Sequence, residues 1–250
     1  MEEIHELLGI PKIKIYQNDE LNSFSVDSMI LGSFATIKKS TKRILDLGTG
    51  NAPIPLYLTL RTDAKIFGVE IQQELYKLAV KSVKINMKEE QINLICDDLK
   101  NISNHFDLHS FDLVVSNPPF FKANEDSHIN PNEVKAIARH EIKANLDDFI
   151  QCASLMLKNG GFLSIVHRPD RLSDIICTMR KYKIEPKRIR FVYPDEYSES
   201  NQVLVEGIYC GKLDGLKILK PLYIHPKIDI NKDEIVDIYN GEQKEWGLCS

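Results

Sequence analysis

The distribution of apolar and polar residues along the chain predicts strands that alternate with helices. Short apolar runs predict seven strands, namely Arg43–Leu47, Lys65–Glu70, Ile92–Cys96, Phe111–Ser116, Phe162–Val166, Arg188–Tyr193 and Gln202–Tyr209. Apolar residues at helical spacing predict helices over Asp27–Ile37, Glu74–Met87, Leu146–Leu157 and Leu172–Met179. This alternation is typical of an α/β protein with a mostly parallel sheet.

The residues at the ends of these segments predict the limits of one helix and the pairing of the last two strands. Asn145 is expected to cap the third helix, because Asp148 stands three residues on as a capping-box partner, and Asn159-Gly160-Gly161 is expected to end that helix. No helix is predicted between the last two strands. They are therefore expected to form an antiparallel hairpin at one edge of the sheet.

The tetrapeptide Asn117-Pro118-Pro119-Phe120 follows the strand Phe111–Ser116 directly. An aryl amine is a poor nucleophile, because its lone pair is delocalised into the ring. The Asn117 side-chain carbonyl and the Pro118 backbone carbonyl can accept both amine hydrogens and free that lone pair, since a Pro-Pro loop is stiff and offers no donors. Phe120 can stack on the base. The loop predicts a site that holds a planar amine, and an ordinary turn is the alternative.

A glycine turn, Asp46-Leu47-Gly48-Thr49-Gly50-Asn51, follows the first strand. Gly48 and Gly50 can adopt positive φ and let a ligand approach the backbone closely. Ala52 stands where a dinucleotide-binding fingerprint has its third glycine, which argues against a pyrophosphate cradle. Asp46 suits a ligand that carries an ammonium group, as S-adenosylmethionine (SAM) does.

Carboxylates end the next two strands. Glu70 lies twenty residues past Gly50 and can accept both ribose hydroxyls of such a ligand. Asp98 is the expected acceptor for the cofactor's adenine amine, because Leu99 can then pack under the ring, and Asp97 is the alternative. A helix start is the other interpretation of each carboxylate. All of them fall at carboxyl ends of strands, where doubly wound sheets bind ligands.

Taken together, these motifs resemble class I SAM-dependent methyltransferases, and among them the bacterial tRNA(Val) (adenine-N(6))-methyltransferase family in its Gram-positive-type branch. The resemblance covers nearly the whole chain. Besides the two loops above, it includes Phe24-Ser25-Val26-Asp27, Gly68-Val69-Glu70, Ala138-Arg139-His140-Glu141, Val166-His167-Arg168-Pro169 and Phe191-Val192-Tyr193-Pro194.

The resemblance implies a Rossmann-like enzyme with a seven-stranded sheet. The implied reaction is SAM-dependent methylation of the adenine N(6) amine just 3′ of the anticodon in a valine tRNA, with S-adenosyl-L-homocysteine as product. The implied cofactor contacts include Asp27 near the ammonium group and Asn117, while Phe24 is expected near the substrate base. Ser25 or Asp27 as a helix cap is compatible with these roles.

Two further segments are implied to contact the substrate. Arg139 and His140 follow the Asn-Pro-Pro loop, and they form either a lid that orders on RNA binding or a structural ion-pair cluster with Glu141. Arg168 meets a tRNA phosphate or the substrate side of the pocket, or else it pairs with Asp170 or Glu141.

The composition is that of an ordinary soluble globular protein. The 250 residues are 43% hydrophobic and 27% charged, and they predict one domain. We expect an N-terminal cap and helix over 1–42, a catalytic core over 43–210 and a C-terminal extension over 211–250. No apolar run approaches the roughly twenty residues of a membrane span, and Met1–Glu6 lacks a signal-peptide core. A cytoplasmic protein is expected, with a monomer favoured over an oligomer.

The cysteines predict no covalent or metal framework. They stand at positions 96, 152, 177, 210 and 249, without Cys-x-x-Cys spacing. Such cysteines are typical of reduced thiols, so neither a disulfide nor a metal site is expected.

Basic residues are concentrated in one segment of a chain whose formal net charge is −4. Arg180–Arg190 holds six basic residues and one acid, whereas Asp229–Ser250 holds six acids and two bases. The basic segment can dock a nucleic-acid backbone or form a solvated helix face and strand edge. The acidic loop Asp195–Glu199 follows it, where the resembling family more often carries lysines, which weakens the expectation of RNA contact there.

Two other functions fit parts of the pattern. A methyltransferase that acts on another amine, such as a protein glutamine, would grip its substrate with the same loop, but it would normally bring an extra N-terminal helical domain. A non-catalytic SAM- or RNA-binding module is the other alternative. The intact Asp46, Glu70 and Asn117 argue against lost catalysis. The leading hypothesis is therefore adenine methylation in tRNA.

Overall fold

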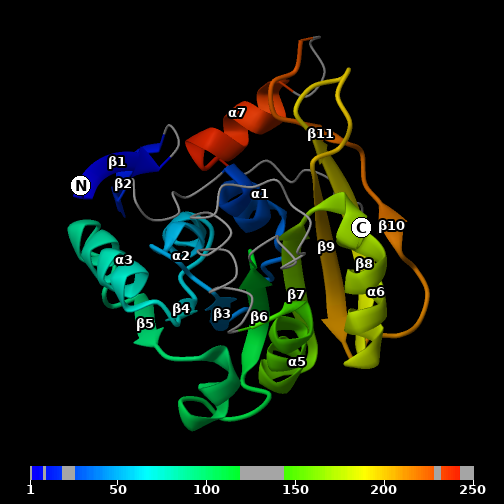
Figure 1. Cartoon of the computed structure of the whole chain (residues 1–250), viewed down its shortest axis with the longest axis horizontal. Helices are drawn as coiled ribbons and strands as arrows, with labels where there is room; N and C mark the ends of the chain where they lie inside the picture. The colour runs from blue at the N-terminus through cyan, green and yellow to red at the C-terminus, as the bar shows by residue number, and fades with distance from the viewer. Residues whose placement is uncertain (1, 8–9, 19–25, 119–143, 228–231, 243–250) are drawn as a thin grey trace, which may run out of the picture.

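The computed structural model describes residues 2–7, 10–18, 26–118, 144–227 and 232–242. Within them, a nine-stranded sheet lies between two layers of helices (Figure 1). The strands of this sheet are β3 (Arg43–Leu47), β4 (Lys65–Glu70), β5 (Ile92–Cys96), β6 (Phe111–Ser116), β7 (Leu157–His167), β8 (Ile184–Tyr193), β9 (Gln202–Tyr209), β10 (Lys217–Ile218) and β11 (Leu222–Tyr223). The helices are α1 (Val26–Phe34), α2 (Pro53–Leu58), α3 (Gln73–Ile85), α5 (Leu146–Met156), α6 (Leu172–Lys181), α7 (Lys232–Asn240) and the short 3-10 helices η1 (Leu99–Asn104) and η2 (Pro169–Arg171).

The topology of the sheet confirms the predicted fold class. The strand order is β10-β8-β9-β7-β6-β3-β4-β5, and β11 also pairs with β8. Strands β3 to β7 run parallel, whereas β9 runs antiparallel to both β7 and β8. The mostly parallel sheet and its antiparallel edge hairpin are therefore as expected. The two-residue strands β10 and β11 lie parallel to β8 and add to the seven predicted strands.

The predicted end of one helix is wrong. Helix α5 ends at Met156, and Asn159-Gly160-Gly161 lies inside β7. Leu157 already has an extended backbone and pairs with Phe111 on β6. Gly160 has φ +78°, and the β6–β7 register shifts just after Phe111. The glycines therefore belong to an irregular stretch of strand, not to a loop between helix and strand. At the start of α5, the capping box between Asn145 and Asp148 is confirmed.

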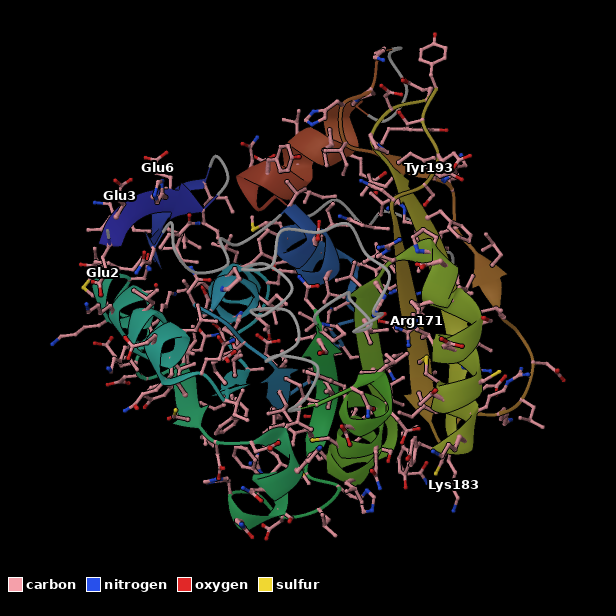
Figure 2. All side chains as sticks on the ribbon, viewed as in Figure 1. Glu2, Glu3, Glu6, Arg171, Lys183 and Tyr193 are labelled. Carbon is pink, nitrogen blue, oxygen red and sulfur yellow. The ribbon has the colours of Figure 1, made fainter. Side chains whose placement is uncertain are left out.

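The N-terminal region contains a hairpin that the sequence analysis did not predict. Strand β1 (Glu2–Leu7) pairs antiparallel with β2 (Ile10–Asn18). Figure 2 shows Glu2, Glu3 and Glu6 along β1, and all three are exposed. Strand β2 lies against α3, where the Tyr16 backbone N–H donates to Ser82 Oγ at 2.9 Å. The hairpin therefore extends the helical layer over one edge of the sheet.

Side chains alternate between the two faces of each central strand. Ile44 and Leu113 belong to the apolar cluster formed with α1, α2, α3, α7 and the hairpin. Leu45 and Val114, one residue further along the same strands, belong to the cluster formed with η1, α5 and α6. The sheet is therefore covered on both faces, as parallel sheets generally are. No helix of the described residues combines the length and apolar character that a membrane span requires.

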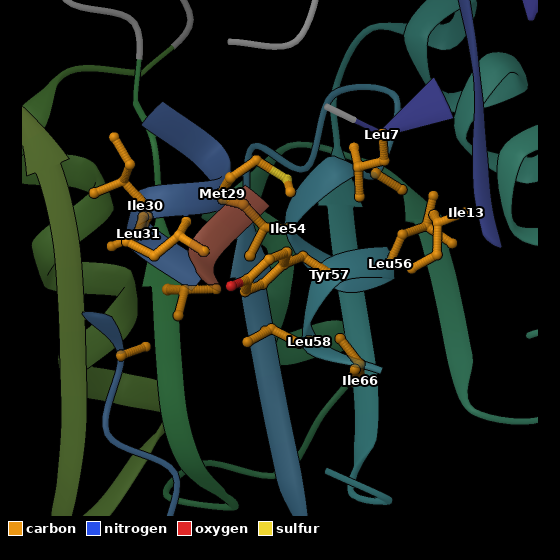
Figure 3. Packing of buried hydrophobic residues seen from close by; sticks show 14 of the residues in the cluster. Leu7, Ile13, Met29, Ile30, Leu31, Ile54, Leu56, Tyr57, Leu58 and Ile66 are labelled. Carbon is orange, nitrogen blue, oxygen red and sulfur yellow. The ribbon is translucent and has the colours of Figure 1, made fainter. Parts of the chain in front are cut away.

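Helices α1 and α2 approach each other closely in the first of these layers. Figure 3 shows Met29 and Ile54 beside the ring of Tyr57, and all three side chains are buried. Gly32 makes the approach possible, because a Cβ at this position would stand 2.7 Å from Cδ1 of Tyr57. The contact fixes α1, which carries residues of the candidate site.

The basic segment Arg180–Arg190 is not a free cationic surface. The Arg188 guanidinium lies 2.8 Å from Glu206, whose side chain is 1% exposed, and Arg190 pairs with the buried Glu234. Two more of its cations form ion pairs, Arg180 with Glu185 and Lys181 with Asp147. The side chains of Arg188 and Arg190 are only 16% and 12% exposed, so these two arginines are largely committed to buried acids. Arg180 and Lys181 remain 58% exposed, and phosphate docking by the first part of the segment stays a prediction.

The direction of β8 places its two ends at opposite edges of the sheet. Figure 2 shows Lys183, just before β8, and Tyr193, its last residue, at opposite ends of the molecule in this view. Because β8 and β7 are both antiparallel to β9, they run in the same direction. Tyr193 therefore lies at the same edge as the carboxyl ends of β3 to β7.

Candidate functional site

The predicted site residues meet at the carboxyl edge of the parallel strands. Asp46 lies in β3, Glu70 ends β4, and Asn117 follows β6. Strand β3 is central and pairs with both β4 and β6. The Ser116 hydroxyl donates to the Leu47 carbonyl at 2.9 Å and ties the ends of β6 and β3 together. The topology thus brings the glycine turn and the dipeptide Asn117-Pro118 side by side, as predicted.

Asp46 is a buried carboxylate with one unsatisfied oxygen. Its side chain is 0% exposed. Thr49 Oγ1 donates to Oδ2 at 2.6 Å, whereas Oδ1 has no hydrogen-bond partner among the described residues. Burial raises the pKa of Asp46 to about 7, the Thr49 hydrogen bond opposes the rise, and the charge of Glu70 adds to it. A buried carboxylate with a free oxygen is suited to a positively charged ligand group.

The glycine turn has the backbone conformation that its glycines predict. Gly48 and Gly50 have φ of +75° and +58°. The Gly48 and Thr49 N–H groups donate to the Val69 carbonyl at 2.9 and 3.0 Å, which fixes the turn to β4. A Cβ added at Gly50 would meet nothing within 4 Å. The backbone therefore stays open to a ligand on that side.

Glu70 bridges the glycine turn and the start of the following segment. Its Oε2 accepts from the Gly50 N–H and its Oε1 from the Gln72 N–H, both at 2.9 Å. The side chain is 4% exposed. Burial raises the pKa of Glu70, and the backbone hydrogen bonds oppose the rise. Each carboxylate oxygen can accept a second hydrogen bond, so the bridge leaves capacity for ligand hydroxyls.

The two acids after β5 have different surroundings. Asp98 caps η1, with Oδ1 accepting from the Lys100 N–H at 3.0 Å, so its helix-cap alternative is confirmed. Asp97 accepts from Asn101 at 2.9 Å and lies 2.7 Å from His105, and these hydrogen bonds lower its pKa to about 2. Both oxygens of Asp97 are engaged within the protein. Of the two, Asp98 is the better candidate for a ligand amine.

Asn117 contacts the start of α1. Its Nδ2 donates to Ser28 Oγ at 3.4 Å, across 89 residues of sequence. Ser28 is 4% exposed, Asn117 is half-buried and Pro118 is buried. Phe120 lies outside the described residues. The structure thus describes both predicted acceptors for the amine, the Asn117 side chain and the Pro118 carbonyl, but not the expected stacking ring.

Asp27 lies in the first turn of α1 and is 8% exposed. Gln202, the first residue of β9, donates through Nε2 to Asp27 Oδ1. Sequence reasoning identified neither Gln202 nor Ser28, because their partners are distant in the chain. The other residue expected from this N-terminal motif, Phe24, lies outside the described residues.

Arg168 adopts the paired alternative. Its Nε lies 3.3 Å from Asp170 Oδ1, and both side chains are about half exposed. The neighbouring His167 ends β7 and is 1% exposed, with Nδ1 accepting from the Arg168 N–H at 2.8 Å. Burial and the nearby arginines lower the pKa of His167 to about 4, so it is neutral at physiological pH. Arg139 and His140 lie outside the described residues.

Comparison with known proteins identifies the family of this chain. The family model described as Methyltransferase small domain matches residues 22–179. A tRNA1(Val) (adenine(37)-N6)-methyltransferase from Tolumonas auensis is 30% identical over 172 residues, which cover 65% of this chain and 69% of the relative. A protein of the same name from Porphyromonas gingivalis is 28% identical over 238 residues, which cover 92% of both chains.

Solved structures share the fold at low sequence identity. A predicted O-methyltransferase from Agrobacterium tumefaciens has a TM-score of 0.69 and 21% identity, covering 86% of this chain and 96% of its own. TYW2 from P. horikoshii, solved in complex with MeSAdo, has a TM-score of 0.57 and 13% identity, covering 84% of this chain and 72% of its own. The matching family model spans more than half of this chain. The chain therefore belongs to the methyltransferase small domain family.

Proposed function

We propose that this protein is a SAM-dependent methyltransferase that acts on the N(6) amine of adenine in tRNA, at the position 3′ of the anticodon of a valine tRNA. The observation that carries the proposal is the position of Asn117 and Pro118 beside the strand ends that hold Asp46 and Glu70. Relatives with the name tRNA1(Val) (adenine(37)-N6)-methyltransferase support the substrate. From the sequence resemblance alone, we also propose the Gram-positive-type branch of that family.

The chain's residues fit SAM as the methyl donor. The unsatisfied Asp46 Oδ1 would accept from the ligand's ammonium group. Gly48 and Gly50 would let the cofactor approach their backbone closely, and Glu70 would accept hydrogen bonds from the ribose hydroxyls with its remaining lone pairs. Asp98 would accept from the adenine amine. When bound, SAM supplies an electrophilic methyl group, and S-adenosyl-L-homocysteine is the product. Asp27, in the first turn of α1, is a further contact that we assign to the cofactor's methionine end.

The remaining residues would hold the target adenine. Asn117 Oδ1 and the Pro118 carbonyl would accept hydrogen bonds from the two amine hydrogens, so that the nitrogen lone pair is free to attack the methyl group. The amine would release one proton to solvent as positive charge develops on its nitrogen. Phe120 would stack on the base, and Phe24 would line the same pocket. Placement of the reactants would supply much of the rate gain in such a site.

We also propose how the chain is divided. Residues 1–42 form an N-terminal region, residues 43–210 the catalytic core and residues 211–250 a C-terminal extension of one domain. Arg139, His140 and Arg168 remain our candidates for RNA contact, and the Arg168–Asp170 ion pair would open to admit a phosphate. Because tRNA is the substrate, we propose a cytoplasmic enzyme, and we favour a monomer.

Replacing Glu70 with alanine is expected to weaken SAM binding by about 1–3 kcal/mol, the scale of hydrogen bonds to a charged group. The variant loses the acceptor for the ribose hydroxyls and also the bridge between Gly50 and Gln72. Isothermal titration calorimetry with S-adenosyl-L-homocysteine measures the change. Equal affinity in wild type and Glu70→Ala would rule out the ribose contact.

The affinity for SAM is expected to fall as the pH drops below about 7. The folded-state pKa of Asp46 is raised to about 7, so the unliganded carboxyl gains a proton below that pH. An ammonium group binds the ionised form, and affinity should therefore fall by about tenfold per pH unit under the pKa. Fluorescence titration between pH 8 and pH 5.5 measures the slope. Asp46→Asn, which cannot ionise, should bind weakly at every pH, and an identical slope in this variant would contradict the assignment.

The modified nucleosides of cellular tRNA test the proposed substrate. A strain that lacks the protein should lose N(6)-methyladenosine from its valine tRNA and regain it when the wild-type chain is restored. Mass spectrometry of nucleosides from purified tRNA(Val) measures this. An unchanged N(6)-methyladenosine content in the deletion strain would contradict the proposal.

A further inference from the structure

The first turn of α1 is attached to two strand ends at the carboxyl edge of the sheet. Ser28 Oγ accepts from Asn117 Nδ2 at 3.4 Å, at the end of β6. The adjacent Asp27 accepts from Gln202, at the start of β9. Ser28 is 4% exposed, so water competes little for its hydroxyl. A helix that precedes the first parallel strand thus reaches the loop that we assign to the target amine.

The two ends of the Asn117 amide are chemically opposite. The Oδ1 end accepts hydrogen bonds, whereas the Nδ2 end only donates. If the amide were rotated by half a turn, its N–H groups would face the hydrogens of the target amine. An amide in that orientation cannot accept from the amine and cannot release its lone pair. The orientation of this side chain therefore matters as much as its presence.

We infer that Ser28 is a positioning residue for the amine-binding loop. Its hydroxyl accepts from Asn117 Nδ2 and holds the Asn117 side chain in a position in which Oδ1 is free to accept from the amine. This inference rests on the proposed function, because it presumes that Asn117 Oδ1 accepts from the substrate. It assigns a role to a residue that carries no chemistry of its own in the reaction.

The far end of α1 is held firmly enough for this role. Arg188 Nη2 donates to the Phe34 carbonyl at 2.7 Å, and Arg61 Nη1 donates to the Ala35 carbonyl at 2.9 Å. Arg61 is half-buried, and burial lowers its pKa to about 10, which leaves it charged at physiological pH. With the Asp27–Gln202 contact at the start and these cations at the end, α1 presents Ser28 from a fixed position.

Replacing Ser28 with alanine is the direct test. Alanine favours the helix, and the variant should keep its melting temperature and its affinity for S-adenosyl-L-homocysteine. The kcat for methylation of tRNA should fall on the order of tenfold, the scale of one neutral hydrogen bond. Ser154→Ala is the matched control, because Ser154 is a buried helical serine that donates to Gln151 of its own helix. An unchanged kcat in Ser28→Ala, or a loss that merely follows a lower melting temperature, would overturn the inference.

The same substitution in an Asn117→Ala background separates the contact from packing. Alanine leaves no amide for Ser28 to hold. Ser28→Ala should therefore reduce kcat much less in Asn117→Ala than in the wild-type background, and equal losses in both would assign Ser28 a purely structural role. If the wild-type enzyme itself forms no N(6)-methyladenosine, the proposed function fails, and that result is distinct from a failure of the Ser28 assignment.

Discussion

Asn117→Ala is expected to reduce methyl transfer by on the order of 100-fold or more, comparable to the loss of one preorganised transition-state contact. The substitution removes the side-chain acceptor for the amine and leaves only the Pro118 carbonyl. Asn117 is half-buried just after β6, and we assign its side chain more to the substrate amine than to the cofactor. The variant should therefore fold and bind SAM normally. Single-turnover methylation of tRNA measures the loss of the chemical step separately from binding.

Asn117→Asp is the matched control for this substitution. A carboxylate still accepts from the amine, so this variant should lose less activity than Asn117→Ala. If both variants lose activity equally while SAM affinity is retained, the Asn117 side chain does not act by accepting a hydrogen bond from the amine. If Asn117→Ala transfers methyl groups at the wild-type rate, the loop does not hold the substrate amine.

Arg188→Ala is expected to lower the free energy of unfolding by about 3–5 kcal/mol, the usual cost of breaking a buried ion pair. Arg188 donates through Nε to Glu206 at 2.9 Å, and Glu206 also accepts from the Thr36 backbone and the Ser164 hydroxyl at 2.7 Å each. Truncation would leave the carboxylate of Glu206 buried without its guanidinium. Urea unfolding followed by circular dichroism measures the change.

Two controls sharpen this stability test. Lys181→Ala removes an exposed ion pair with Asp147 and should leave the unfolding midpoint nearly unchanged. Arg188→Met combined with Glu206→Gln removes both buried charges and should recover part of the lost stability. If Arg188→Ala and Lys181→Ala have the same stability, the arginine is free at the surface and the basic segment is again a candidate for RNA binding.

The central strands and the site at their ends could be predicted because buried parallel strands form short continuous apolar runs. The bounds of β3, β4 and β6 agree with the prediction. Each run carries, in its last two residues or just after its end, a residue to which we assign a chemical role, namely Asp46, Glu70 or Asn117. Once the strands are parallel, geometry places these residues at one edge.

Strand β1 and helix α2 could not be predicted, because their sequences show little of the apolar pattern of a strand or a helix. In β1 only Leu7 is buried, so the strand lacks the apolar alternation that identifies a half-buried strand. Helix α2 begins with Pro53, a favoured first helical residue, but its six residues are too few to show a helical apolar period. In both cases the surrounding structure determines the element more than its own sequence does.

Long-range polar contacts could not be predicted from spacing. Ser28 and Asn117 are 89 residues apart, and Asp27 and Gln202 are 175 residues apart. The basic segment illustrates the same limit, because its composition suggests an RNA surface while Arg188 is directed into the protein by Glu206. Such pairs depend on the order of strands in the sheet, which brings distant residues together.

Methyl transfer to unmodified tRNA(Val) tests the central claim most directly. The purified wild-type chain is incubated with SAM carrying a labelled methyl group and with the unmodified transcript, and the nucleosides are then separated. The proposal predicts label in N(6)-methyladenosine from the residue 3′ of the anticodon, and its loss in Asn117→Ala. Label in protein, label in a base without an exocyclic amine, or no transfer at all would contradict it.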